Sequence, residues 1–435
     1  MCRPAHLATL TQKRLQRIQK DLTRLSDLAR AKMKMLHVIR TLDPAWGGPV
    51  EGVKNIVAKA GALGHSAEIT CLDTPRSSWL KALDLHVNAI GPASLGKFGY
   101  CRRLDSWLEE NVRRFDAIAA NGIWMYFSAA VRRAAMRAGI PYFVFTHGAL
   151  DPWFKHTYPF KHIKKQIYWS LVEHKVLRDA SAVLFTTADE QALSYRAFWP
   201  YRCNPKVIGY GIQDPFLSKI SSKEPTEARQ LLRRFVPELA ERKFLLFLAR
   251  IHEKKGVGLL LQAIARNGNH YHDRAFVIAG PGTNAYVSEL KSMAVQLGLK
   301  NQVIWTGPLY GELKWAAMRQ AEAYVLPSHQ ENFGIAVAEA LACGVPVLIT
   351  IKVNIWREIV ENRAGLAEND DVSGICRLLE KWSGLHDAQK SFMRERARRC
   401  FLDHFDIANT SANLFSLFAQ KQPADQKEAA LQCVS

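Results

Sequence analysis

Residues 323–349 read AYVLPSHQENFGIAVAEALACGVPVLI, a stretch in which two short apolar runs flank a longer segment. The runs at 323–326 and 345–349 predict strands, and residues 333–342 between them predict a helix. A strand, a helix and a second strand in this order are typical of a parallel sheet covered by helices. The stretch therefore predicts an α/β fold.

The same alternation extends outward over most of the chain. Further strands are predicted at 36–40, 67–71, 117–120, 142–146, 182–185, 206–208, 244–248, 275–279 and 302–305, and helices at 49–63, 104–114, 256–264 and 287–297. The pattern occurs twice, on either side of the polar stretch 213–243. We therefore expect two doubly wound lobes that face each other across a cleft, with ligands at the carboxyl ends of the strands.

The composition is that of an ordinary folded protein. A chain of 435 residues predicts two or three domains, and its 48% apolar and 23% charged residues exclude a disordered or collagenous protein. No apolar run approaches the ~18 residues of a spanning helix. Eight cysteines without a C-x-x-C pair, and no secretory leader pattern, predict a reducing cytoplasm.

The net charge of +19 predicts anionic partners, and the charge is densest at the beginning of the chain. Residues 1–34 contain nine basic and two acidic side chains, with leucine and isoleucine three to five positions apart. This pattern predicts a basic amphipathic helix. Three interpretations are open: it lies on an anionic membrane, it pairs with another helix, or translation starts at Met33 or Met35 and it is absent.

Two carboxylates eight residues apart, Glu331 and Glu339, are the strongest candidates for a binding site. Glu331 precedes the predicted helix, where free backbone N–H groups and the helix dipole can hold an anion. There its carboxylate can accept hydrogen bonds from sugar hydroxyls, while the amides of Asn332, Phe333 and Gly334 face a phosphate. The spacing alone favours a capping Glu331 and a surface Glu339, because two glutamates eight residues apart are common.

Three other loops follow predicted strands and carry candidate residues. Arg250 and Lys255 come after the strand 244–248, where a guanidinium and an ammonium can reach a diphosphate, although a solvated basic loop has the same composition. Gly47 and Gly48 follow the first strand, so their amides can approach an anion, or they can simply form a tight turn.

The third loop carries His147 and Asp151 after the strand 142–146. A histidine on a glycine-flanked loop is a better candidate for function than one on a helix face. Asp151 precedes Pro152, so a turn-forming role competes with a functional one.

Several other chemistries are disfavoured. Residues 280–285 imitate a dinucleotide-binding G-x-G-x-x-A turn, but the next predicted strand lacks the acidic residue for a ribose, so an NAD-dependent oxidoreductase is a minor alternative. The chain has no phosphate-binding P-loop and no Asp-x-Asp pair, and His270 and His272 lack partners at metal-ligand spacing. The sequence has no zinc-finger spacing, and its aromatic residues are not interleaved with the basic clusters. It therefore gives no support for nucleic-acid binding.

Taken in order, these residues resemble the group 1 (family 4) glycosyltransferases of the two-lobed GT-B fold over about residues 35–420. The run from Glu331 to Glu339 with the following ALACGVPV carries most of the resemblance, supported by Arg250 with Lys255. Residues 147–153, HGALDPW, are similar to the HGMLDPW signature of a bacterial surface-polysaccharide subgroup, with Ala149 in the methionine position. Ala249 and the stretch 209–212 depart from the family pattern.

The resemblance implies retaining transfer of a hexosyl unit from a UDP- or GDP-linked sugar to a glycan or polyprenyl-diphosphate-linked acceptor, without a metal or other cofactor. It implies catalytic roles for His147, Arg250, Lys255 and Glu331, donor binding by Gly47, Gly48, Asn332, Phe333, Gly334, Glu339 and Leu309, and an acceptor-side role for Asp151. A sugar-binding protein that has lost catalysis is the main alternative.

The resemblance also divides the chain. It implies an extension at 1–34, an acceptor lobe at 35–212, a nucleotide-sugar lobe at 213–395, and C-terminal helices at 396–435 that cross back to the first lobe and end in a polar tail. The basic first lobe then predicts association with the anionic inner face of the plasma membrane.

Overall fold

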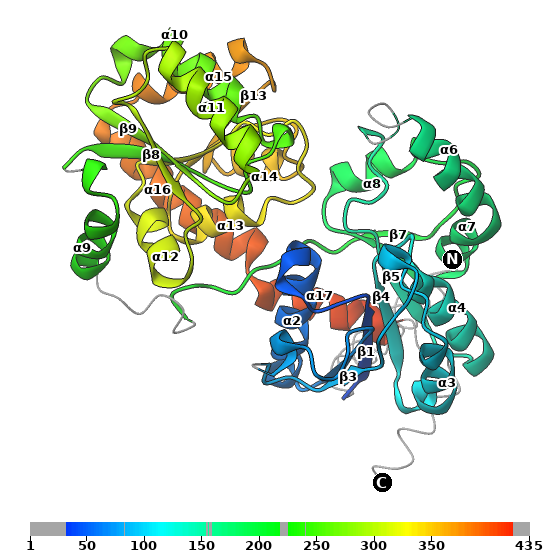
Figure 1. Ribbon diagram of the computed structural model, residues 1–435. Coiled ribbons are helices and arrows are strands. Elements are labelled where there is room, and N and C mark those ends of the chain that lie inside the picture. The colour runs from blue at the N-terminus through cyan, green and yellow to red at the C-terminus, as the bar shows by residue number, and fades with distance from the viewer. Residues whose placement is uncertain are drawn as a thin grey trace, which may run out of the picture.

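Two parallel sheets with their covering helices form the two lobes of the computed structural model (Figure 1). It describes residues 32–420 apart from 82, 154, 156–158, 218–224 and 240. The α/β class and the two doubly wound lobes are confirmed. The predicted amphipathic helix before residue 32 and the polar tail after residue 420 lie outside the described residues.

The first sheet has seven strands in the order β3-β2-β1-β4-β5-β6-β7, and every neighbouring pair is parallel. Its strands are β1 (Lys34–Ile39), β2 (Ser66–Cys71), β3 (Val87–Ala89), β4 (Ala117–Asn121), β5 (Tyr142–Phe145), β6 (Ala182–Phe185) and β7 (Pro205–Val207). The helices are α2 (Gly48–Ala60), α3 (Arg102–Asn111), α4 (Tyr126–Ala138), α6 (Pro159–Tyr168), α7 (His174–Asp179) and α8 (Ala188–Ser194).

The second sheet has six strands in the order β10-β9-β8-β11-β12-β13, again all parallel. They are β8 (Lys243–Leu248), β9 (Arg274–Ala279), β10 (Val303–Gly307), β11 (Ala323–Leu326), β12 (Val347–Thr350) and β13 (Gly365–Glu368). The helices are α9 (Pro225–Phe235), α10 (Val257–Arg266), α11 (Asn284–Gln296), α12 (Gly311–Gln320), α13 (Ile335–Ala342), α14 (Trp356–Glu361), α15 (Val372–Ser383) and α16 (Asp387–Cys400).

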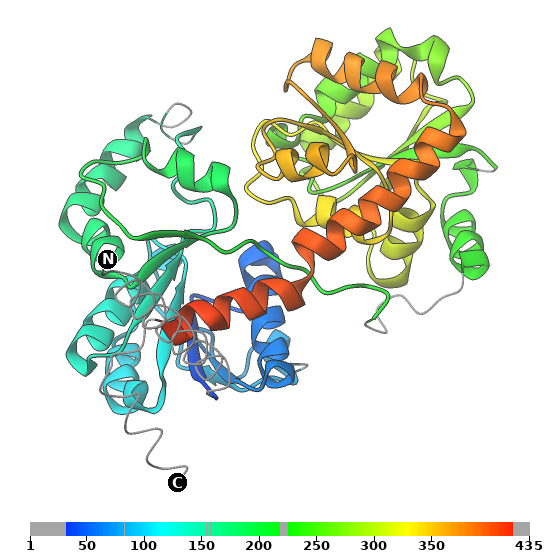
Figure 2. The same ribbon diagram turned by 180° about the vertical axis from the view of Figure 1, so that it is seen from behind.

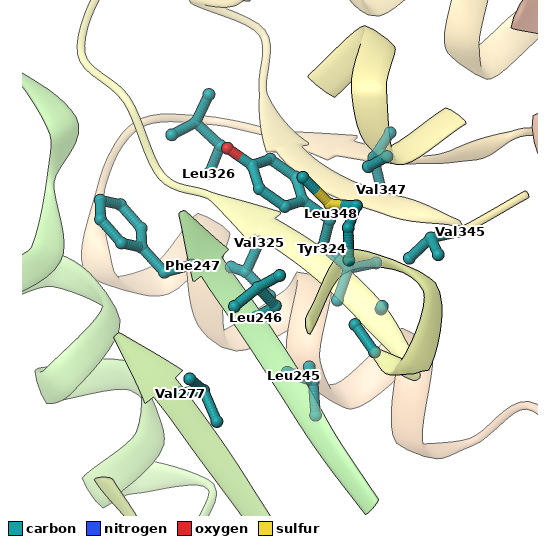
Figure 3. Close-up of a cluster of buried hydrophobic side chains, with 14 of the residues drawn as sticks. Leu245, Leu246, Phe247, Val277, Tyr324, Val325, Leu326, Val345, Val347 and Leu348 are labelled. Carbon is teal, nitrogen blue, oxygen red and sulfur yellow. The ribbon is translucent and has the colours of Figure 1, made fainter. Parts of the chain in front are cut away.

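The strands are apolar throughout because helices pack on both faces of each sheet. On β5, Tyr142 and Val144 belong to a cluster with α4, whereas Phe143 and Phe145 belong to one with α17 (Ile407–Gln420). Alternate side chains of a strand point to opposite faces, so both faces of β5 are buried. The second lobe is built in the same way, with β8 and β11 at the centre of its core (Figure 3).

Two edge strands, β3 and β13, were not predicted. The residues of β3 are only half-buried, and β13 buries only its first residue, so neither forms the apolar run that marks a central strand. Several element boundaries also differ from the predicted ones. The strand predicted at 345–349 begins at Val347, because Pro346 has no N–H to donate to the sheet, and the helix predicted from 333 begins at Ile335.

Two chain segments connect the lobes and run side by side. Ile212 donates a backbone hydrogen bond to Phe405 (2.9 Å) and accepts one from Ile407 (3.0 Å). The expected boundary at 395/396 falls inside α16, which continues to Cys400 before α17 returns to the first sheet (Figure 2). None of the helices in the described part of the chain has both the length and the apolar character needed to cross a membrane.

Candidate active site

The loops after β1, β5, β8 and β11 meet between the lobes at a cavity of about 310 Å³. The loops after β1, β8 and β11 lie where the order of strands reverses in each sheet, and this is the usual ligand-binding edge of doubly wound sheets. Both lobes line the cavity, through Gly48, Pro49, His147, Thr186, Tyr210, Lys255, Glu331, Asn332, Phe333, Gly334 and Ile335. Seven of the residues predicted from the sequence are among them.

Glu331 is fixed in the loop that leads from β11 to α13. Its backbone N–H donates to Lys352 (2.9 Å), and its carbonyl accepts from the N–H of Asn354 (3.0 Å). Gly334 caps α13 with a φ of +81°, a left-handed conformation that favours glycine. Asn332, Phe333 and Gly334 line the cavity directly before the N-terminus of α13, a position suited to an anion.

Lys255 forms an ion pair with Glu331 inside the cavity. The next residue, Gly256, approaches β11 so closely that a Cβ atom there would lie 2.0 Å from the carbonyl oxygen of Pro327. This close approach brings the loop after β8 against the loop after β11. The two residues predicted to hold the diphosphate and the sugar thus lie together.

The electrostatics of this corner favour an anionic ligand. Burial, with the added positive charges of Lys254 and Arg250, lowers the pKa of Lys255 to about 7. Glu331 forms its ion pair with Lys255 beside these cations. Lys254, Lys255 and Arg250 repel one another, so a bound anion near Lys255 would reduce this repulsion. Arg250 itself is exposed and does not line the cavity.

His147 lies on the loop after β5 with a left-handed φ of +48°. Its ring stacks on Phe145, with 5.3 Å between centroids, and meets the edge of Tyr210. Burial lowers the pKa of His147 to about 4, so the imidazole is neutral at pH 7. Among the described residues its Nε2 has no hydrogen-bond partner, which leaves this atom for a ligand in the cavity.

The loop of His147 is held by Glu190, a buried residue of α8 that the sequence did not single out. One carboxylate oxygen accepts from the Thr146 hydroxyl and the Gly148 N–H, both at 2.6 Å. The other accepts from the N–H and the hydroxyl of Thr186, both at 2.7 Å. Thr187 caps the N–H of Glu190, so the sequence pattern indicates only an ordinary helix start.

Two polar contacts join the lobes beside the cavity. Asn332 donates to the hydroxyl of Thr186 (3.0 Å), and Gln330 donates to the carboxylate of Asp151 (2.6 Å). Asp151 also accepts from the N–H of Trp153 (2.8 Å), so it both forms the expected turn and contacts the other lobe. It borders two further cavities, of about 70 and 620 Å³.

Three predicted donor-binding residues do not line the 310 Å³ cavity. Glu339 faces α12, where it pairs with Lys314 at 2.5 Å, a partner that no sequence pattern indicated. Leu309 is buried in the loop after β10, and Gly47 precedes α2 with a φ of +74°.

In the turn at 280–285, close packing of the backbone requires glycine at the first position, Gly280. A Cβ atom on Gly280 would lie 1.8 Å from the carbonyl oxygen of Ala249, because the ends of β8 and β9 meet there. This contact explains the glycine at position 280 without a ligand. Across the described residues, no group of three or more His, Cys, Asp or Glu side chains is arranged to hold a metal ion.

Two family models match the chain and between them span most of it. The model described as glycosyl transferases group 1 matches residues 229–399, and the glycosyl transferase 4-like domain matches residues 47–211. The first matched segment contains Lys255, Glu331 and Glu339, and the second contains Gly48 and His147.

Curated relatives carry similar descriptions. The chain is 26% identical to the GDP-mannose:cellobiosyl-diphosphopolyprenol alpha-mannosyltransferase of Xanthomonas oryzae pv. oryzae, over 86% of this chain and 93% of that protein. It is 33% identical to a D-inositol 3-phosphate glycosyltransferase of Geodermatophilus obscurus, over 40% of this chain and 39% of that protein. Its matches to several relatives span only 39–55% of their length.

A solved structure supports the architecture. Anabaena HepE, crystallised with UDP and glucose, superposes with a TM-score of 0.67 over 88% of this chain and 98% of that one, at 18% identity. The two sheets therefore have the GT-B arrangement.

Proposed function

Since this chain belongs to the group 1 (family 4) glycosyltransferases, we propose that it transfers a hexosyl unit from a nucleotide-diphosphate sugar to a glycan or lipid-linked oligosaccharide. The observation that carries the proposal is the shared cavity in which both lobes place His147, Lys255, Glu331 and the amides before α13. These groups suit a sugar joined to a diphosphate.

In the proposed reaction, the bond between the anomeric carbon and the diphosphate oxygen breaks while the acceptor oxygen bonds to the same face of that carbon. Because attack and departure occur on the same face, configuration is retained. The acceptor proton passes to the departing phosphate oxygen. Lys255, together with the nearby charge of Arg250 outside the cavity, neutralises the leaving diphosphate, and this preorganised charge is the main catalytic contribution. Glu331 exchanges its ion pair with Lys255 for hydrogen bonds from sugar hydroxyls.

His147 and Asp151 complete the proposed site. The neutral imidazole of His147 offers its partnerless Nε2 to the sugar and stabilises positive charge at the anomeric carbon. Asp151 borders the 70 Å³ cavity and not the 310 Å³ cavity, and we assign it to the acceptor side of the site. Because cationic side chains supply the charge, we propose that transfer requires no metal or other cofactor.

The relatives guide the choice of substrates. A GDP-mannose-dependent enzyme with a diphosphopolyprenol acceptor and a lipopolysaccharide core mannosyltransferase of Rhizobium meliloti are both similar to this chain. They support a GDP-linked donor and a role in bacterial surface polysaccharide synthesis, and the HepE structure with UDP supports a UDP-linked donor. The net charge of +19 supports a place in the cytoplasm at the inner face of the membrane.

A thermal-shift experiment with UDP, GDP, ADP and NAD, without metal, tests the donor site. At ten times its dissociation constant, a bound nucleotide stabilises the protein by about 1.4 kcal/mol, or roughly a few degrees. We expect a shift with UDP or GDP that Lys255→Ala abolishes and that Lys300→Ala, at an exposed position, preserves. A shift with NAD alone would overturn the proposal.

Transfer itself is measured with the sugar nucleotide that gives the shift. Incorporation of sugar into a lipid-linked acceptor in the presence of EDTA, lost in Lys255→Ala, is the expected result. Nucleotide binding without transfer to any acceptor would instead indicate a sugar-binding protein that has lost catalysis.

A further inference from the structure

The outer face of α6 exposes a continuous apolar stripe. Phe160, Ile163 and Ile167 are 82%, 56% and 59% exposed, and Leu171, in the π-helical turn Trp169–Glu173 that continues α6, is 66% exposed. Their spacing of three or four residues puts them on one side of the helix. Apolar residues on successive turns in water mark a surface made for contact.

Basic residues surround this stripe. Lys155, Lys161, Lys164 and Lys175 are all exposed, and the sequence has no aspartate or glutamate between Asp151 and Glu173. Lysines beside exposed apolar residues on one helix suit a bilayer with anionic headgroups, since the apolar side chains enter the lipid while the cations contact the headgroups. Protein partners of like charge would be repelled.

An exposed tryptophan lies on a loop beside α6, the loop between α8 and β7. Trp199 is 79% exposed, and Gln166 of α6 hydrogen-bonds to both its backbone N–H (3.3 Å) and its carbonyl. The loop is therefore fastened to α6. Tryptophan is enriched at the boundary between lipid and water because its ring is apolar with one polar edge.

The inner side of the same helix leads toward the candidate active site. Lys161, His162 and Lys165 line the 70 Å³ cavity with Ala149 and Asp151. Ala149 is two residues from His147, which lines the 310 Å³ cavity. Thus α6 has an apolar outer face, cations on its inner side, and the His147 loop beyond them.

We propose that Phe160, Ile163, Ile167, Leu171 and Trp199, here termed the docking face, hold the protein on an anionic membrane. A lipid-linked acceptor then presents its phosphates to the cations on the inner side of α6 and its sugar to the cleft. This second step rests on the proposed function, whereas the docking itself does not.

Sedimentation of the full chain with lipid vesicles tests the docking face. Vesicles of phosphatidylglycerol and phosphatidylethanolamine are compared with vesicles of phosphatidylcholine alone. The variant Ile163→Glu/Ile167→Glu is compared with Val295→Glu/Leu297→Glu, which makes the same change of charge at exposed apolar positions of the other lobe. We expect about tenfold weaker binding to anionic vesicles for the first variant only.

Equal binding of the two variants would overturn the proposal, because the contact would then lie elsewhere, for example in residues 1–31. Sedimentation velocity without lipid tests a second copy of the chain as the occupant. A wild-type dimer that dissociates in the first variant would also overturn the proposal.

The thermal shift with UDP or GDP is measured in the same variant. Loss of vesicle binding with the shift intact separates docking from donor binding, and vesicle binding without any shift would overturn only the proposed function.

Discussion

Glu190 controls the conformation of the candidate catalytic histidine without lining its cavity. The left-handed φ of His147 is unfavourable for a residue with a side chain, and it persists because hydrogen bonds fix the residues on either side. Glu190 accepts those bonds from Thr146 and Gly148, and it also holds Thr186, which Asn332 of the other lobe contacts. Contact between the lobes and the position of His147 are thereby linked.

The substitution Glu190→Gln should lower kcat while leaving nucleotide binding nearly unchanged. The glutamine amide has one acceptor oxygen, and its NH2 group can donate to a threonine hydroxyl but not accept from a backbone N–H. One buried N–H, of Gly148 or Thr186, therefore loses its acceptor, and the loops that Glu190 joins shift. A displacement of about 1 Å at a reacting group reduces the rate roughly 100-fold. Steady-state kinetics, with nucleotide affinity from thermal shifts, measure the two effects separately.

A double-mutant cycle with His147→Ala identifies the route of the effect. If Glu190 acts by positioning His147, Glu190→Gln should cause little further loss of kcat in the His147→Ala background. Equal losses in both backgrounds would contradict this role. No effect of His147→Ala alone would instead remove His147 from the proposed site.

At the scale of elements, the connection between the lobes depends on a close approach of two segments. A Cβ atom on Gly211 would lie 2.5 Å from the Cα atom of Ile407, so the segments can pair only if residue 211 has no side chain. Nearby, buried Asp214 accepts from Arg398 of α16 (2.6 Å), which fastens the first crossing segment to the helix that leads into the second.

We therefore expect Gly211→Ala to separate the crossing segments and to destabilise the protein by about 1–3 kcal/mol, the usual cost of overpacking. Urea denaturation measures the change. Gly61→Ala is the control, because Gly61 has an ordinary helical φ of −61° and a Cβ atom there would meet no neighbouring atom within 4 Å. Equal stability of the two variants would show that the crossing segments adjust freely.

At the scale of the whole molecule, buried ionisable groups set the dependence of stability on pH. Burial lowers the pKa of His37, in the core of the first lobe, to about 4. Between this value and the unfolded value of about 6.5, the unfolded chain binds the proton and the folded protein does not. Stability is therefore full above pH 6.5 and falls as the pH drops toward 4. Burial raises the pKa of Glu173 to about 7, and this carboxyl acts in the opposite direction.

The substitution His37→Gln isolates the contribution of one histidine. Its amide oxygen can still accept from Asn121, but it does not titrate. Between pH 6.5 and pH 4, wild type should lose more stability than the variant, by a difference on the order of 3 kcal/mol. Urea denaturation at several pH values measures the difference. Parallel curves for the two proteins would show that His37 is not the titrating group.

The sequence predicted the central strands and their alternation with helices along the chain. It could do so because both faces of a parallel strand are buried, so its residues form unbroken apolar runs. It also predicted which loops carry candidate residues, since those loops follow strands. The edge strands β3 and β13 were missed because their partly buried residues leave no such run, whereas the edge strands β7 and β10 were predicted.

Only the tertiary structure decided which of the candidate residues lie together. The ion pair of Lys255 with Glu331 and the partnering of Glu339 with Lys314 depend on how loops of different strands approach one another. The role of Glu190 likewise depends on a loop 42 residues earlier in the chain. Sequence periodicity reports burial along one element, whereas these contacts join residues far apart in the chain, so local patterns determined the fold and packing between elements determined the site.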